Sequence, residues 1–121
     1  IDVSFISLRI IFAALAPLIA AGGQIVSLIK PQFEAGREQV GKSGVVRNPA
    51  VHRDVMRRVA EYAAEQGFEL QGLTFSPITG GEGNIEFLGY WTKGERIPAA
   101  LPPETGEWIR QTAEEAARQL S

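Results

Sequence analysis

The sequence contains no cysteine and only one histidine among its 121 residues. Without cysteine the chain can form no disulfide framework, no thiol nucleophile and no cysteine-ligated zinc or iron–sulfur site. One histidine cannot build a histidine-rich metal centre, and it leaves few options for a Ser-His-Asp arrangement. This residue, His52, stands near the predicted start of a helix, where we expect it to face solvent and to take no part in catalysis. We therefore expect a function that needs no metal.

The chain also lacks an apolar run long enough for a membrane span, which takes about 20 residues. The longest run, residues 8–21, ends at Gly22 and Gly23 and predicts a helix, with Pro17 bending it or marking its last turn. A helix that is apolar nearly all round is buried on more than one side. No signal peptide is visible. We expect a cytoplasmic protein that does not act at a membrane.

The remaining composition is that of one small soluble domain, with 45% hydrophobic and 21% charged residues. The formal net charge of -2 is unevenly distributed. Residues 30–58 carry seven basic and three acidic side chains, whereas residues 59–121 carry four basic and ten acidic ones. The basic segment would suit a polyanion such as nucleic acid. Two solvated helix faces of opposite sign explain the same charges without a ligand.

Hydrophobic periodicity and turn residues predict the element order β-α-β-loop-α-β-β-α. The apolar run at residues 24–29 is typical of a parallel strand. The glycine-rich residues 79–84 predict a tight turn and an antiparallel hairpin. The expected elements are a strand ending at Asp2, a helix over 8–21, strands over 24–29, 68–76 and 85–92, a loop over 32–47, a helix from Asn48 to Gly67 and a helix over 104–120. The pattern predicts an α/β fold with parallel strands that end in an antiparallel hairpin.

Three charged residues, Asp2, Lys30 and Glu86, mark three of these strands. Ligands of an open α/β sheet bind in the crevice outside the strand ends. Lys30 follows four apolar or small strand residues, so it is either a partly desolvated base or a side chain that reaches back to solvent. Glu86 lies within an apolar strand, where a carboxylate is costly unless it is paired. Two carboxylates around one lysine form a plausible reaction centre.

The segments that hold these residues resemble a known family. They are Asp-Val-Ser-Phe-Ile-Ser (2–7), Lys-Pro-Gln-Phe-Glu (30–34), Gly-Lys-Ser-Gly-Val-Val-Arg-Asn-Pro (41–49) and Ser-Pro-Ile-Thr-Gly-Gly-Glu-Gly-Asn-Ile-Glu-Phe (76–87). In order and in length they are similar to the conserved segments of the TlyA family, whose members are often named hemolysin A. The likeness runs from Ile1 to about Trp91.

The resemblance implies a ribosomal RNA 2′-O-methyltransferase that uses S-adenosyl-L-methionine and has an FtsJ-like, Rossmann-like catalytic domain. It implies a Lys-Asp-Lys-Glu tetrad in which Asp2, Lys30 and Glu86 are the aspartate, the second lysine and the glutamate. Asp2 and Phe5 would lie at the cofactor, although Phe5 fits a core position equally well. The partners implied are ribosomal RNA or ribosomal subunits.

Two parts of the family pattern do not occur in this sequence, namely the first lysine and the glycine-rich cofactor motif. We therefore expect the chain to represent the C-terminal half of the methyltransferase sheet. Residues 1–92 would belong to the catalytic domain, and residues 93–121 would form a linker and a C-terminal helix. Such a fragment would be inactive alone, and its first strand would expose an edge through which it could self-associate.

Three basic residues of the predicted loop, Arg37, Lys42 and Arg47, are candidates for contacts to RNA phosphates. Asn84 could orient Glu86 or simply shape the turn. Two other functions stay open on the sequence. One is a non-catalytic RNA- or protein-binding domain that keeps the fold. The other is a membrane-active hemolysin, for which residues 8–21 are the only support.

Overall fold

The computed structural model describes residues 8–35, 45–77, 83–95 and 101–120. The predicted strand ending at Asp2 and most of the predicted loop and hairpin turn lie outside these ranges. The helices are α1 (Leu8–Leu15) with a 3₁₀ turn η1 (Ala16–Leu18), α2 (Pro31–Glu34), α3 (Pro49–Glu65) and α4 (Pro103–Leu120). The strands are β1 (Gln24–Ile29), β2 (Phe68–Phe75) and β3 (Phe87–Lys93).

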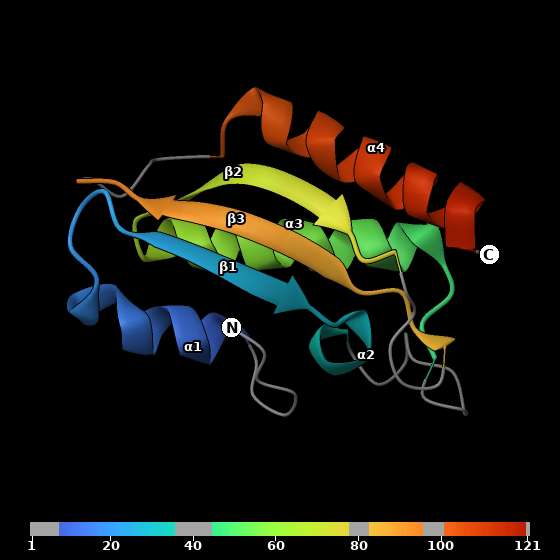
Figure 1. The fold of residues 1–121 in the computed structure, drawn as a ribbon, viewed down its shortest axis with the longest axis horizontal. Helices are drawn as coiled ribbons and strands as arrows, with labels where there is room; N and C mark the ends of the chain where they lie inside the picture. Colours follow the sequence, from blue (N-terminus) through green and yellow to red (C-terminus); the bar gives the residue numbers. More distant parts are fainter. Residues whose placement is uncertain (1–7, 36–44, 78–82, 96–100, 121) are drawn as a thin grey trace.

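The three strands form one sheet in the order β1-β3-β2 (Figure 1). The predicted hairpin is confirmed, because β2 pairs antiparallel with β3. β1 pairs with the other side of β3 and is also antiparallel to it. β1 and β2 thus run in the same direction but do not pair with each other. Within the described residues the apolar run of β1 therefore has an antiparallel partner, and not the parallel one that its composition suggested.

One face of the sheet carries the core. Ile25, Ile29, Phe87 and Trp91 point to this face and are almost fully buried. The Trp91 indole N–H donates to the Ser27 hydroxyl at 2.8 Å, so the polar atom of the largest core side chain is satisfied. Figure 1 shows α3 behind this face, with α1 beside β1 and α4 beside β2. No described helix covers the opposite face.

Local signals explain where α3 begins and ends. The Asn48 side chain caps the helix by accepting the Ala50 backbone N–H at 2.9 Å, and Pro49 occupies the first helical position. The chain leaves the helix through Gly67, whose φ of 85° favours glycine. The predicted cap and stop are therefore confirmed.

The first two helices differ from the prediction. α1 ends at Leu15, with Pro17 in the 3₁₀ turn, and it is buried on one side only. Phe12 lies in the core, whereas the side chains of Ile10 and Leu18 are 61% and 78% exposed. The expectation of burial on more than one side was wrong for the described residues. α2 lies where a loop was expected, because Pro31 starts a helix directly after β1.

The C-terminal helix packs on the same core as the rest of the chain. α4 lies against α3 and β2 and buries Ile109, Ala113 and Ala116. Trp108 of the same helix is 37% exposed. Residues 103–120 are thus integrated with the sheet rather than separate from it.

One end of the sheet is closed by glycine turns, and we call it the glycine end. Gly22, with φ of 87°, donates its backbone N–H to the Lys93 carbonyl at 2.8 Å. Gly94 donates to the Gly67 carbonyl, also at 2.8 Å. These bonds tie the start of β1 and the start of β2 to the end of β3. The glycine end is therefore held mainly by backbone contacts.

Candidate active site

The other end of the sheet carries polar side chains, and we call it the polar end. Lys30 follows the last residue of β1, Glu86 precedes the first residue of β3, and Ser76 follows β2. Ile29 pairs with Phe87, so one further step along the two strands brings Lys30 opposite Glu86. The Ser76 backbone N–H donates to the Glu86 carbonyl at 2.8 Å, which extends the β2–β3 ladder by the same step. The register therefore places Lys30, Glu86 and Ser76 in one row.

The pleat of the sheet also determines which way Lys30 and Glu86 point. Ile29 and Phe87 face the core, and successive side chains of a strand point to opposite faces. Lys30 keeps an extended backbone, with φ of -110° and ψ of 97°. Lys30 and Glu86 are therefore both directed to the face opposite α3, and both are half-buried. Residues opposite each other in antiparallel strands have Cα atoms about 5 Å apart, so the two backbones are close at this point.

The backbone of Lys30 is fixed by the helix that follows it. Its carbonyl accepts the N–H groups of Phe33 and Glu34 at 2.9 and 3.2 Å. The Glu34 carboxylate in turn accepts the backbone N–H of Leu8 at 2.8 Å. A carboxylate at a helix start is favourable because it complements the helix dipole. α2 thus connects the end of β1 to the start of α1.

The position of Glu86 differs from the sequence prediction in one respect. It lies directly before β3 and not inside the strand, because β3 begins at Phe87. The half-buried carboxylate is therefore at the rim of the sheet, where a substrate could approach it. Lys30 and Glu86, two of the predicted site residues, thus lie at the same end of the sheet, each one step beyond the Ile29–Phe87 pair.

His52 is fully buried, so the expectation that it faces solvent was wrong. Its Nε2 lies 2.9 Å from the carbonyl oxygen of Val46, and a carbonyl can only accept, so Nε2 carries the proton. The imidazole ring packs edge-on against Phe87 with centroids 5.3 Å apart. Burial lowers the pKa of His52, and the hydrogen bond to Val46 opposes that shift. His52 is therefore a neutral side chain of the core beside the polar end.

Asn84 makes a contact that the sequence did not suggest. It is 2% exposed, and its Oδ1 accepts the Val46 backbone N–H at 2.8 Å. The side-chain amide of Asn84, two residues before Glu86, thus holds the segment that leads into α3. Sequence reasoning missed Ser76, and it missed the connection among Asn84, His52 and Val46.

The other predicted site residues divide between described and undescribed parts of the chain. Asp2, Phe5, Arg37 and Lys42 lie outside the described residues. Arg47 is described, and its side chain is exposed next to Val46. In the part of the chain that the structure describes, no group of three or more His, Cys, Asp or Glu residues could hold a metal ion. No helix among the described residues is long and apolar enough to cross a membrane.

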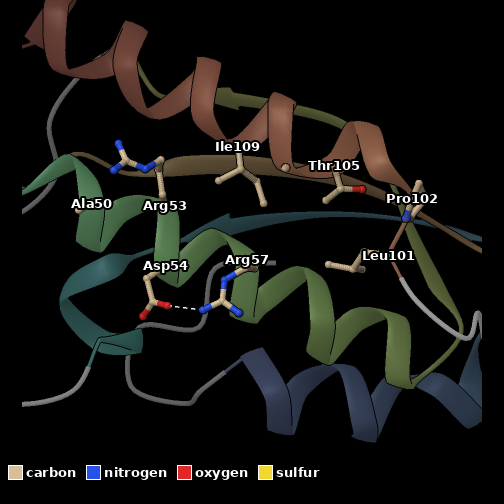
Figure 2. A pocket seen from close by; sticks show the side chains of 9 residues that line it. Ala50, Arg53, Asp54, Arg57, Leu101, Pro102, Thr105 and Ile109 are labelled. Atoms are coloured by element: carbon tan, nitrogen blue, oxygen red, sulfur yellow. Dashed lines mark hydrogen bonds and ion pairs between the residues drawn. The ribbon is translucent and has the colours of Figure 1, made fainter.

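A groove of about 400 Å³ lies between α3 and α4 (Figure 2). Leu101 and Ile109 give it an apolar floor, and Arg53 and Arg57 stand on its α3 side. Arg57 is paired with Asp54 at 2.6 Å. Neither Lys30 nor Glu86 lines this groove. The one carboxylate that lines the groove, Asp54, is thus engaged by Arg57, and the groove is separate from the polar end.

Comparison with known proteins identifies the fold around this charged pair. The model of the family described as FtsJ-like methyltransferase matches residues 1–93. The chain belongs to the FtsJ-like methyltransferase family. The described mixture of helices and an antiparallel sheet fits the α/β fold of that family.

Individual relatives agree with the family match. The chain is 48% identical over 126 aligned residues to "Putative rRNA methyltransferase YqxC" of Bacillus subtilis, covering 99% of this chain and 42% of that protein. It is 41% identical over 100 residues to "16S/23S rRNA (cytidine-2'-O)-methyltransferase TlyA" of Mycobacterium tuberculosis, covering 82% of this chain and 37% of that protein. The resemblance to TlyA proteins is therefore confirmed.

A solved structure matches the described fold closely. The "Putative hemolysin from Streptococcus thermophilus" superimposes with a TM-score of 0.82 at 47% identity, covering 97% of this chain and 42% of that one. The chain thus spans about two fifths of the length of its relatives. Membership of the family is established for this chain, whereas the activity of the whole protein is a matter for proposal.

Proposed function

We propose that the chain forms the C-terminal part of the catalytic domain of an RNA methyltransferase that acts on a ribose 2′-hydroxyl of ribosomal RNA. The single observation that carries this proposal is the strand register that pairs Ile29 with Phe87, the residues next to Lys30 and Glu86, at the polar end. In a member of the FtsJ-like family, these are the residues expected to form half of the catalytic tetrad. The name of the mycobacterial relative supports ribosomal RNA as the substrate class.

A ribose 2′-hydroxyl is a weak nucleophile at neutral pH, so the reaction needs a group that accepts or stabilises its proton. We assign this role to the Lys30 amine. Glu86, from the adjoining strand, is proposed to orient the amine. Asp2 is proposed to complete the group from the neighbouring strand end. The half-buried setting strengthens these interactions because it excludes part of the solvent.

We propose S-adenosyl-L-methionine as the methyl donor, with Asp2 and Phe5 as the residues of this chain that contact it. When bound, this cofactor supplies an electrophilic methyl group on a positively charged sulfur. The charges at the polar end fit such a group, since the Glu86 carboxylate balances positive charge close to Lys30. Besides accepting the proton, Lys30 has to hold the attacking oxygen in line with the methyl group. No group needs to activate the leaving group, because the cofactor brings its own.

RNA would be bound by the basic residues between β1 and α3. We propose Arg37, Lys42 and Arg47 as contacts to the phosphate backbone, which would fix the position of the RNA without reading its sequence. The substrate would be ribosomal RNA, free or within a ribosomal subunit, and the protein would work in the cytoplasm. Residues 1–92 would serve the catalytic domain, and residues 93–121 would supply a linker and the supporting helix α4.

The chain would also tend to self-associate. β1 is an edge strand among the described residues, and its Val26 side chain is 53% exposed. Edge strands with exposed apolar side chains favour pairing with another chain. Without the rest of a methyltransferase sheet, we expect the 121-residue chain to be inactive by itself.

The direct test is transfer of labelled methyl groups from S-adenosyl-L-methionine to ribosomal subunits and to free ribosomal RNA. The assay should compare the 121-residue chain with the product of the complete gene. We expect label from the complete product only, at a ribose whose 3′ linkage then resists alkaline cleavage. Label on a base would contradict the proposed chemistry. RNA binding without any transfer would favour the non-catalytic binding domain.

A further inference from the structure

Two buried polar side chains from different elements converge on one residue, Val46. Asn84, which precedes β3, accepts the Val46 N–H at 2.8 Å through its Oδ1. His52, in the first turn of α3, donates from Nε2 to the Val46 carbonyl at 2.9 Å. Asn84 is 2% exposed and His52 is fully buried. We call this arrangement of His52, Asn84 and Val46 the Val46 clamp.

The clamp is costly in a core that could have been apolar. A buried imidazole loses its hydration, and the Nδ1 atom of His52 has no hydrogen-bond partner in the part of the chain that the structure describes. Apolar residues of similar size often stabilise a protein as well as buried polar groups do. What the polar groups add here is a defined position, because both backbone groups of Val46 are satisfied at once.

The fixed position of Val46 restricts the backbone of the next residue, Arg47. On one side of Arg47 is the clamped Val46, and on the other is Asn48, which caps α3 through the Ala50 N–H at 2.9 Å. The backbone of Arg47 is therefore held from both sides, while its side chain is exposed. Asn84 is two residues from Glu86 in the chain. The clamp thus ties the backbone next to an exposed arginine to the segment that precedes β3.

We propose that His52 and Asn84 are positioning residues that hold the backbone next to Arg47 so that this arginine contacts an RNA phosphate. This inference rests on the proposed function, because it needs RNA to approach the polar end. A guanidinium held in place loses less conformational freedom when it binds a phosphate than one on a loose backbone. The clamp would therefore act on RNA affinity and not on the methyl-transfer step itself.

A double-mutant cycle tests the inference. The affinity of the product of the complete gene for a fluorescein-labelled RNA hairpin would be measured by anisotropy between about 50 and 200 mM salt. We expect Arg47→Ala to weaken binding about fivefold and to lower the slope of log affinity against log salt by about 1. Asn84→Ala should cause most of the same loss, and the double variant should be no weaker than Arg47→Ala alone. Arg118→Ala, an exposed arginine of α4, is the matched control and should change neither quantity.

His52 offers a second pair of variants in case Asn84→Ala folds poorly. His52→Gln keeps a donor that can reach the Val46 carbonyl, whereas His52→Leu removes it at similar volume. We expect His52→Gln to retain RNA affinity and His52→Leu to lose it to the same extent as Arg47→Ala. Amide hydrogen exchange at Val46 should accelerate in His52→Leu and in Asn84→Ala, which reports on the clamp without any RNA.

The outcomes separate the clamp from the function on which it rests. If the losses of Asn84→Ala and Arg47→Ala add, or if Asn84→Ala leaves the salt slope unchanged, the positioning role is overturned and the clamp is only structural. If the unmodified protein does not bind the hairpin, the proposed function fails and the positioning role fails with it. If RNA binding is normal in His52→Leu although Val46 exchanges faster, only the positioning role is overturned.

Discussion

The two ends of the sheet are built in different ways. At the glycine end, Gly22 and Gly67 turn the chain with positive φ values, and backbone hydrogen bonds tie the strands together. At the polar end, Lys30 and Glu86 stand opposite each other, and His52 and Asn84 hold the backbone of a third segment. Backbone bonds with glycine are sufficient to close a sheet. The polar end differs in that side chains, and not only backbone groups, lie where the strands end.

The largest expected effect comes from Glu86→Gln, assayed in the product of the complete gene. This change keeps the shape of the side chain but removes the charge beside Lys30. We expect methyl transfer to fall by about 100-fold, because acid–base groups typically contribute 10²–10⁴-fold. Initial rates of label transfer measure this. Glu69→Gln is the matched control, since Glu69 is an exposed carboxylate paired with Thr92 toward the glycine end. A loss of equal size in both variants would remove the distinction between the two ends.

The corresponding experiment at the glycine end is Gly67→Ala. A side chain at a φ of 85° is strained, so we expect the free energy of unfolding to fall by about 1–2 kcal/mol. Added atoms are not the cause, because the nearest atom to a Cβ at this position is 4.0 Å away. Urea unfolding measures the loss, and Gly72→Ala in β2 should show no comparable one. Transfer per folded molecule should be unchanged, and a specific loss of transfer would mean that the glycine end takes part in the reaction.

A smaller effect at the polar end depends on pH. The pKa of His52 in the folded chain lies below the ordinary value of 6.5, so between these two values the unfolded chain binds more protons. We expect the contribution of neutral His52 to the free energy of unfolding to be fully present above pH 6.5. This contribution should decrease as the pH falls from 6.5 toward the lower pKa of the folded chain. Denaturant titrations over this range should show less pH dependence in His52→Gln. An unchanged pH profile in that variant would contradict a neutral, buried His52.

The smallest effect concerns β1, which is an edge strand among the described residues. Val26→Lys places a charge on the exposed face of edge strand β1. We expect weaker self-association in sedimentation, with no change in unfolding beyond about 0.5 kcal/mol. Association that is as strong in Val26→Lys as in the unmodified chain would place the contact elsewhere.

Local sequence signals predicted many of the features that distinguish the two ends of the sheet. Asn48 and Pro49 define the start of α3, and the glycines mark the turns, because caps and turns depend on neighbouring residues. The hairpin followed from a short glycine-rich connection. Lys30 was found because a charge after an apolar strand is unusual. These features need no knowledge of distant contacts.

The antiparallel pairing of β1 with β3 could not be predicted from the residues of β1. A continuous apolar run indicates that a strand is buried, but it does not reveal the direction of its partner. The row of Lys30, Glu86 and Ser76 depends on this pairing. α2 was missed because four residues are too few to show helical periodicity, although Pro31 at its first position was a signal.

The burial of His52 was missed because the residue was not assigned to the buried face of α3. The buried side chains of this helix are His52, Val55, Met56, Val59, Ala60 and Ala63. His52 continues the i, i+3, i+4 and i+7 spacing of that stripe, although the sequence analysis placed it in solvent. The hydrogen bond to Val46 that makes this burial tolerable comes from outside the helix. No periodicity within α3 could reveal it.

The central claim is that the polar end, and not the glycine end, performs the chemistry. The most direct test compares Lys30→Ala with Lys93→Ala in the product of the complete gene. Both lysines are half-buried at strand ends, but Lys93 packs over the Phe68 ring at the glycine end, with its ammonium 5.7 Å from the ring centroid. We predict that transfer of labelled methyl to ribosomal RNA falls at least about 100-fold in Lys30→Ala. We predict normal transfer per folded molecule in Lys93→Ala. Equal rates in the two variants would contradict the account.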